Sequence, residues 1–157
     1  MTTISSIMTA RVTTVAPDLP LYDLICLLLD HNVGGAPVVD AHGRAIGMVS
    51  KSDLIWEDHD WAESQRTEGQ RQPWRLAAGE GGLFDDRALT GRTVADVMTS
   101  RAVSVLPTAT IPEAARLMAQ NRIHRLPVVD PVGVLVGIVT TFDITRWVAD
   151  KHGAGRP

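Results

Sequence analysis

The sequence predicts a mixed α/β (α+β) fold in which two copies of a strand-helix-strand-strand-helix unit pack sheet against sheet. Two observations predict it: an internal repeat with a period of 90 residues, and the same order of β-prone and amphipathic segments in each repeat. The 157 residues are 45% apolar and 21% charged, a composition typical of folded globular proteins. Because a unit of about 55 residues buries too little surface to be stable alone, we expect both copies to form one body.

The repeat becomes visible when the chain is shifted by 90 residues against itself. The two copies align without a gap, a register that chance does not preserve. The coinciding residues are Met8 and Met98, Thr9 and Thr99, Gly47 and Gly137, Asp53 and Asp143, and the Pro-Val-Val-Asp stretches at 37–40 and 127–130. The sequence therefore divides into a first repeat at 3–57, an intervening segment at 58–92, a second repeat at 93–147 and a tail at 148–157.

Each repeat opens with a short strand and an amphipathic helix. Residues 13–15 and 103–105 are β-prone and are soon followed by a proline, which has no N–H for a β-ladder. Apolar residues then recur at three- and four-residue spacing over 21–29 and from Ile111 to Met118, which predicts a helix in each copy. The helix of the second copy also carries a capping box, Thr110 with Glu113, and Pro112 in its first turn.

A hairpin and a second helix complete each repeat. We expect strands at 36–40 and 45–50, and again at 126–130 and 135–140, each pair joined by a four-residue loop. Just after each hairpin, a hydroxyl stands three residues before a carboxylate, in the pairs Ser50 with Asp53 and Thr140 with Asp143. This spacing is typical of a helix start.

The composition argues against several kinds of partner. The formal net charge of −3 supplies no basic surface for nucleic acid. No apolar run approaches the roughly 18 residues that cross a bilayer, so no membrane partner is expected. The chain begins without the features of a secretory signal, and Cys26 is the only cysteine, so no internal disulfide can form. These observations predict a cytoplasmic location.

In this order and in duplicate, the motifs resemble the tandem cystathionine-β-synthase (CBS) domain pair, also called a Bateman module. The resemblance rests on Met-Thr near each repeat start, on Pro-Val-Val-Asp, on the Gly-x-Val-[Ser/Thr]-x-x-Asp ending and on the doubling. It implies two β-α-β-β-α repeats with pseudo-twofold symmetry, two clefts for adenosine-containing ligands, and a homodimer. It also implies a regulatory role, in which AMP, ADP or ATP is sensed and the activity of an unknown effector protein is modulated. No cofactor is required for such a role.

The family's ribose contacts fall on the two closing motifs. The resemblance assigns them to Ser50 and Asp53 in the first copy and to Thr140 and Asp143 in the second. The chemistry is suitable, because an ionised carboxylate can accept both hydroxyls of a vicinal diol in charge-assisted bonds. The same pairs also fit a helix cap that needs no ligand, and the residues alone leave both interpretations open.

Phosphate contacts are assigned to His124 and Arg125, because the stretch at 122–130 is similar to the phosphate-contacting stretch of the γ subunit of AMP-activated protein kinase. A guanidinium can bind two phosphate oxygens, and an imidazole adds a pH-sensitive donor. The first copy has Gly34 and Gly35 at these positions, so we expect the second cleft to hold a phosphorylated ligand more tightly. The alternative is that both cations lie at a solvated helix end.

Other candidate sites are weaker. Residues 56–61 cluster possible cation ligands, but no second group of ligands stands at metal-site spacing, so no metal is expected. No paired acid and base and no activated nucleophile is recognisable, so we expect no catalytic residues and no enzyme. The intervening segment contains aromatic residues such as Trp61, Trp74 and Phe84 in a charged context, which suits docking on a surface as well as a loop.

Two alternatives to an AMP, ADP or ATP sensor remain at this point. One is a sensor of S-adenosylmethionine or NAD. The other is a ligand-free scaffold or interaction protein that uses the aromatic intervening segment. For the homodimer, we expect apolar helix faces that carry Leu54, Ile55 and Trp56 in the first copy and Ile144 and Trp147 in the second.

Overall fold

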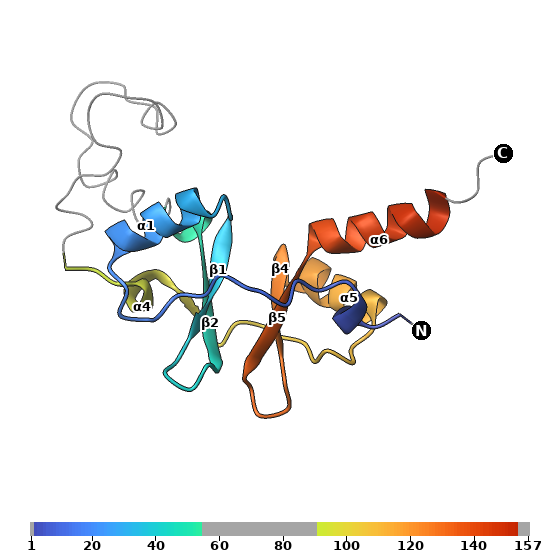
Figure 1. Cartoon of the computed structure of the whole chain (residues 1–157), viewed down its shortest axis with the longest axis horizontal. Coiled ribbons are helices and arrows are strands. Elements are labelled where there is room, and N and C mark those ends of the chain that lie inside the picture. The colour runs from blue at the N-terminus through green and yellow to red at the C-terminus, as the bar shows by residue number, and fades with distance from the viewer. Residues whose placement is uncertain (1, 55–90, 154–157) are drawn as a thin grey trace, which may run out of the picture.

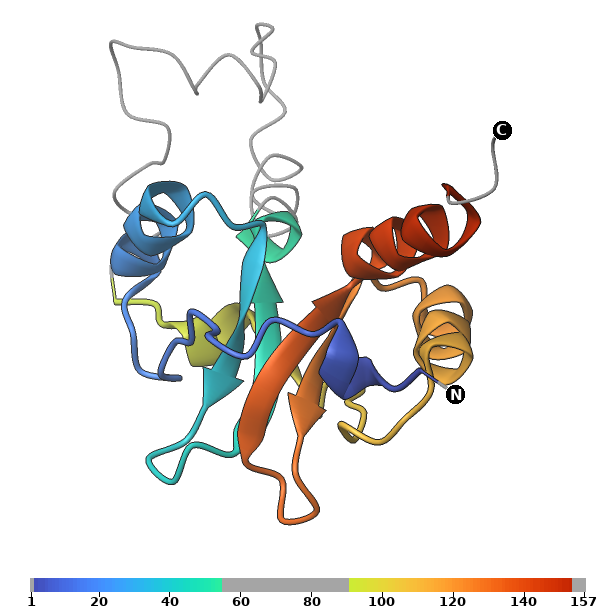
Figure 2. The ribbon, with the colours of Figure 1, turned by 45° about the vertical axis from the view of Figure 1, so that its right-hand side comes forward.

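Two β-hairpins stand side by side at the centre of the molecule, and helices flank them on the outside (Figures 1 and 2). A computed structural model describes residues 2–54 and 91–153. The elements are η1 (Ile4–Ser6), α1 (Leu21–Asp30), β1 (Gly35–Val39), β2 (Ala45–Ser50), α4 (Val94–Val97), β3 (Thr99–Ser100), α5 (Ile111–Asn121), β4 (Arg125–Val129), β5 (Leu135–Thr140) and α6 (Thr141–Gly153). This arrangement confirms the predicted mixed fold of two related copies.

The hairpins have the same register in both copies. Gly35 stands opposite Ser50 in the first, and Arg125 stands opposite Thr140 in the second. Both first strands begin and end one residue earlier than the sequence predicts, because the expected last residue, Asp40 or Asp130, turns into the loop. The carboxylate of Asp40 accepts the N–H groups of His42 and Arg44, and Asp130 accepts those of Val132 and Val134.

The short strands expected at 13–15 and 103–105 are reduced to one parallel bridge each. Val15 bridges Val38, and Val105 bridges Val128. Both valines are buried, so each segment still contributes to the core of its copy. The ladder does not continue in the direction of Pro17 or Pro107, since proline cannot donate an N–H.

Each copy has a core between its hairpin and its amphipathic helix. On α1 the buried residues are Leu21, Leu24 and Leu28, and on α5 they are Ile111, Ala114 and Met118. The predicted capping box of α5 is present: the Glu113 carboxylate accepts the Thr110 N–H at 2.7 Å, and the Thr110 hydroxyl accepts the Glu113 N–H at 3.4 Å.

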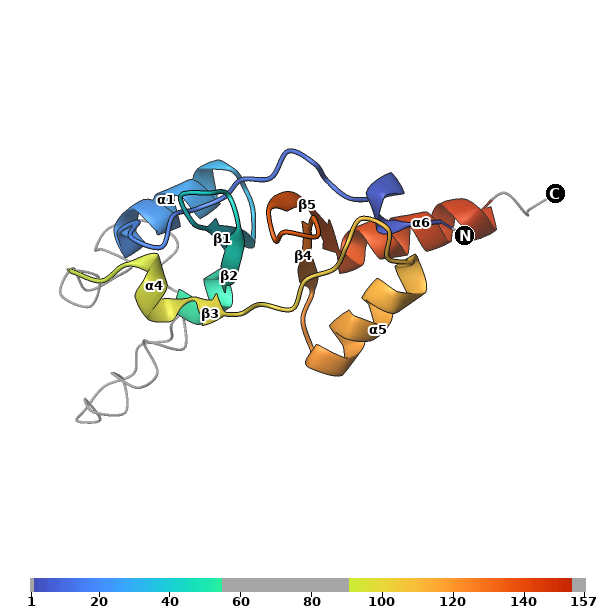
Figure 3. The same cartoon turned by 90° about the horizontal axis from the view of Figure 1, so that it is seen from below.

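The beginning of each repeat packs on the other copy. Ile4 is fully buried in the core of the second copy, and Thr9 bridges Ile138. In the same way Val94 is buried in the core of the first copy, and β3 pairs with β2. Figure 3 shows the two connecting segments crossing between the halves on opposite sides. Each core is therefore completed by residues that belong, in sequence, to the other repeat.

Candidate functional site

The closing motif of each copy fixes a carboxylate at the start of a helix. In the second copy the Oδ2 atom of Asp143 accepts the Thr140 N–H at 2.8 Å and the Thr140 hydroxyl at 2.7 Å. In the first copy the Oδ2 atom of Asp53 accepts the Ser50 N–H at 2.6 Å and the Ser50 hydroxyl at 3.0 Å. Both carboxylates are only partly buried. The capping interaction is therefore present, and it uses one oxygen of each carboxylate.

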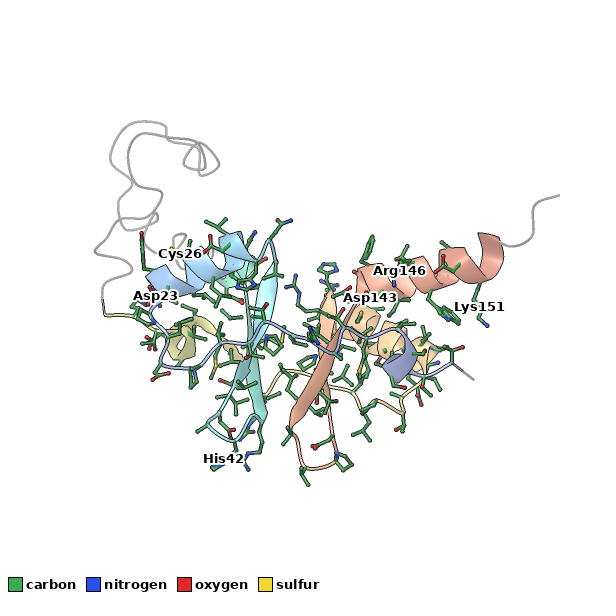
Figure 4. All side chains as sticks on the ribbon, viewed as in Figure 1. Asp23, Cys26, His42, Asp143, Arg146 and Lys151 are labelled. Carbon is green, nitrogen blue, oxygen red and sulfur yellow. The ribbon has the colours of Figure 1, made fainter. Side chains whose placement is uncertain are left out.

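The two carboxylates lie at the end of the hairpins away from the loops. Figure 4 shows Asp143 where β5 meets α6, whereas His42 lies in the loop at the far end of the other hairpin. This placement follows from the sequence, because Ser50 and Thr140 are the last residues of β2 and β5. A helix begins directly after each strand, and its first turn favours a negative charge.

Arg125 reaches from the second copy to the first. Its guanidinium lies so close to the glycine pair of the first copy that a Cβ on Gly34 would be 2.8 Å from Nη2, and a Cβ on Gly35 would be 2.6 Å from Nη1. The same Cβ on Gly35 would be 2.9 Å from the Cα of Ser50. The guanidinium is therefore next to the motif that carries Asp53.

The electrostatics agree with this placement. Partial burial lowers the pKa of the Arg125 guanidinium, and the negative charge of Asp53 opposes that shift. Because an arginine side chain titrates far above neutral pH, it keeps its positive charge. The first copy thus combines a fixed carboxylate with a cation from the second.

This geometry adds a charge that was not expected from the sequence. Gly34 and Gly35 bring no basic side chain of their own, as expected from the residues at these positions. They leave room for Arg125, whose backbone is in the second copy but whose guanidinium lies beside the glycines of the first. A signal was present in the repeat alignment, where two residues without side chains stand opposite two large basic ones.

The remaining predicted site residues are placed as follows. His124 is exposed beside Arg125, and its carbonyl accepts the Thr141 N–H at 2.9 Å. The assignment of His124 and Arg125 to phosphate, and of the two Ser/Thr-Asp pairs to ribose, stays a prediction. Within residues 2–54 and 91–153 no group of three or more His, Cys, Asp or Glu residues is close enough to hold a metal ion.

The expected dimer faces differ from the observed exposure. Leu54, Ile144 and Trp147 are only partly exposed, because each packs against the core of its own copy. The exposed apolar residues of α6 are instead Phe142 and Val148. Ile55, Trp56, the possible cation ligands at 56–61 and the intervening segment at 58–92 lie outside the described residues. The homodimer and the domain boundaries remain predictions.

A hollow of about 540 Å³ lies elsewhere, between the 105–109 segment and α5. Its walls include Leu106, Glu113, Arg116 and Leu117. None of the candidate ligand residues lines it, and its carboxylate, Glu113, is already engaged in the capping box. We therefore place the candidate site at the carboxylates and not in this hollow. In the part of the chain that the structure describes, no helix has the length and apolar character needed to cross a membrane.

Known proteins with a similar sequence or fold identify the family of this chain. The model of the CBS domain family matches residues 4–60 and 94–150. Uncharacterized protein MJ1426 of Methanocaldococcus jannaschii is 35% identical over 137 residues, which are 83% of this chain and 82% of that protein. An inosine-5'-monophosphate dehydrogenase of Nitrosopumilus maritimus is 28% identical over 97% of this chain, but the match spans only 26% of that enzyme.

Among solved structures, CBSX2 of Arabidopsis thaliana in complex with AMP superimposes with a TM-score of 0.74 and 27% identity. The match covers 96% of this chain and 98% of CBSX2. The two matched segments coincide with the two copies of the fold, and each contains one of the fixed carboxylates. The chain belongs to the CBS domain family, as a tandem pair of CBS domains.

Proposed function

We propose that this chain is a regulatory module that binds an adenosine-containing ligand, with AMP, ADP and ATP as the first candidates. Ligand binding would modulate the activity of an effector protein. The observation that carries the proposal is the carboxylate in each copy whose Oδ2 atom is held by the preceding N–H and hydroxyl. Because those bonds use Oδ2, the Oδ1 atom is left to accept a ribose hydroxyl. A carboxylate held in this way needs no reorientation before it binds a ligand.

The position of Arg125 supports a regulatory role. A ligand at Asp53 would meet residues of both copies, since the guanidinium beside that carboxylate comes from the other repeat. Its binding free energy can then depend on how the two halves pack, which is the requirement for a ligand to shift a conformational equilibrium. The AMP complex of CBSX2 makes AMP the first ligand to test. The proposed role is binding without turnover, in the cytoplasm.

The ligand is tested by thermal unfolding with AMP, ADP, ATP, NAD and S-adenosylmethionine. At 100 times its dissociation constant a ligand stabilises the fold by about 2.7 kcal/mol, which corresponds to a rise in Tm of several degrees. We expect this rise with at least one of AMP, ADP and ATP. The double variant Asp53→Asn with Asp143→Asn should lose it, whereas Asp150→Asn, an exposed carboxylate on α6, should keep it.

Other outcomes of this experiment point to the other functions. A shift with only NAD or S-adenosylmethionine would retain the sensor but change its ligand. If none of the five compounds shifts the transition at millimolar concentration, the proposed sensor function is wrong and the scaffold interpretation gains support.

We also propose that the module acts as a homodimer. Phe142 is 70% exposed and Val148 is 43% exposed on α6, and Tyr22 and Leu29 are exposed on α1. Apolar helix residues of this kind are suited to a self-complementary interface. Light scattering should give twice the mass of the 17.0 kDa chain at tens of micromolar, and Phe142→Asp should reduce the dimer fraction. A monomer mass under these conditions would exclude the arrangement.

A further inference from the structure

We propose that Gly34 and Gly35 form a seat for the guanidinium of Arg125, and that this seat makes the Asp53 cleft the one that prefers a phosphorylated ligand. The inference rests on the proposed function and adds to it: it says which cleft prefers an anionic ligand and which residues decide this. It also reverses the preference that the sequence alone predicts.

The first step is steric. The three nearest atoms to a Cβ on Gly34 all belong to the Arg125 side chain, at 2.8 Å from Nη2 and 3.6 Å from Cζ and Nη1. Real Cβ atoms essentially never approach another heavy atom more closely than 3.0 Å. A methyl group at position 34 would therefore move the guanidinium away, and the contact exists only because this residue is a glycine.

The second step concerns the backbone. Gly34 is not among the glycines with positive φ, so alanine at this position avoids the strain of a left-handed backbone. Gly34 is also exposed. Gly35 is different, because a Cβ there would lie 2.5 Å from the carbonyl oxygen of Val49 and would disturb the hairpin itself. Gly34→Ala therefore removes the seat selectively. Gly35→Ala would disturb the hairpin as well as the seat, so its effect on binding could not be assigned to the seat.

The third step is electrostatic. A phosphate next to Asp53 would meet a negative charge, and the guanidinium beside that carboxylate offsets the repulsion. The planar guanidinium can also donate two parallel bonds to phosphate oxygens. Adenosine has the same ribose but no phosphate, so it should respond to Asp53 and hardly to Arg125.

The test separates the two clefts by calorimetric titration with AMP and with adenosine. In an Asp143→Ala background, which retains the Asp53 cleft, we expect Arg125→Ala to weaken AMP binding about tenfold to a hundredfold and to leave adenosine binding nearly unchanged. Gly34→Ala should weaken AMP binding in the same direction. In an Asp53→Ala background, Arg125→Ala should have little effect on either ligand.

The seat itself is tested by combining the two substitutions. If Gly34→Ala acts by moving Arg125, it should have no further effect on AMP binding once Arg125 is alanine. Arg125→Lys should restore only part of the affinity, since an ammonium keeps the charge but not the planar pair of donors. Arg116→Ala is the matched control, because it removes one exposed positive charge from α5.

The outcomes distinguish this inference from the proposed function. An Arg125→Ala effect that persists in the Asp53→Ala background and disappears in the Asp143→Ala background would overturn the inference and leave the sensor intact. Equal losses for AMP and adenosine, or an undiminished effect of Gly34→Ala when Arg125 is alanine, would do the same. If the native chain binds neither AMP nor adenosine, both the inference and the proposed function are overturned.

Discussion

Gly47 and Gly137 are two of the residues at which the two copies meet. A Cβ on Gly137 would lie 2.7 Å from the Met8 sulfur, and a Cβ on Gly47 would lie 2.7 Å from the Thr99 carbonyl oxygen and 3.1 Å from the Met98 sulfur. The Met-Thr pair at the start of each repeat therefore rests on the glycine of the other repeat. This contact explains why Met-Thr at the repeat start and the glycine of the second hairpin strand occur in both copies.

At the residue scale, we predict that Gly47→Ala is more destabilising than Gly137→Ala. The nearest atom to the new methyl group is a backbone oxygen in the first case. In the second case it is the sulfur of the flexible Met8 side chain, and the nearest backbone oxygen, that of Thr9, is 3.1 Å away. We expect Gly47→Ala to cost about 1–3 kcal/mol, measured as a lower urea midpoint at unchanged m-value. If Gly137→Ala lowers the free energy of unfolding as much as Gly47→Ala or more, the Met8 side chain does not move aside for the new methyl group.

At the scale of single elements, three carboxylates stabilise a loop or a helix start. The pKa of Asp40 lies below its ordinary value of 3.8, first because the Arg44 N–H donates to it. The Thr93 N–H lowers the pKa of Asp96, and the Thr110 N–H lowers that of Glu113 from its ordinary 4.5. These side chains share one role, since each carboxylate accepts backbone N–H groups that have no partner in the helix or strand.

These lowered pKa values predict a direction for acid unfolding. A group whose pKa is lower in the folded state stabilises the fold above its ordinary pKa, and this contribution is lost as the pH falls through the folded value. The urea midpoint should therefore decrease below about pH 4.5. The triple variant Asp40→Asn, Asp96→Asn, Glu113→Gln should show a shallower decrease, and Asp18→Asn, an exposed control, should follow the native curve. An unchanged slope in the triple variant would show that these bonds do not contribute.

At the scale of the whole molecule, the crossing segments join the two copies into one cooperative unit. Ile4 has no exposed surface in the core of the second copy, and Val94 has none in the core of the first. Neither core is complete when the other copy unfolds. The hairpin loops add a further connection, because the N–H groups of Ala45 and Leu135 donate to the carbonyls of Gly133 and Gly43.

We therefore predict that the two copies unfold together in a single calorimetric transition. Ile4→Ala should destabilise that whole transition by about 2–5 kcal/mol, although Ile4 belongs to the first repeat and packs in the second. Val132→Ala is the control, because Val132 is 73% exposed in a hairpin loop and should have little effect. Two separate transitions, or an Ile4→Ala variant in which only half of the unfolding signal moves, would contradict this account.

Residue patterns along the chain were enough to predict the repeat, the order of the elements, the hairpins, the capping box of α5 and the pairing of Ser50 with Asp53 and Thr140 with Asp143. These features depend on residue spacing within a few turns of chain, which periodicity and turn chemistry reveal. The packing of each repeat start on the other copy and the contact of Arg125 with Gly34 became apparent only in the folded chain. The same is true of the inward packing of Leu54, Ile144 and Trp147. These contacts join residues that the spacing along the chain does not relate, because their positions depend on how the two copies pack in space.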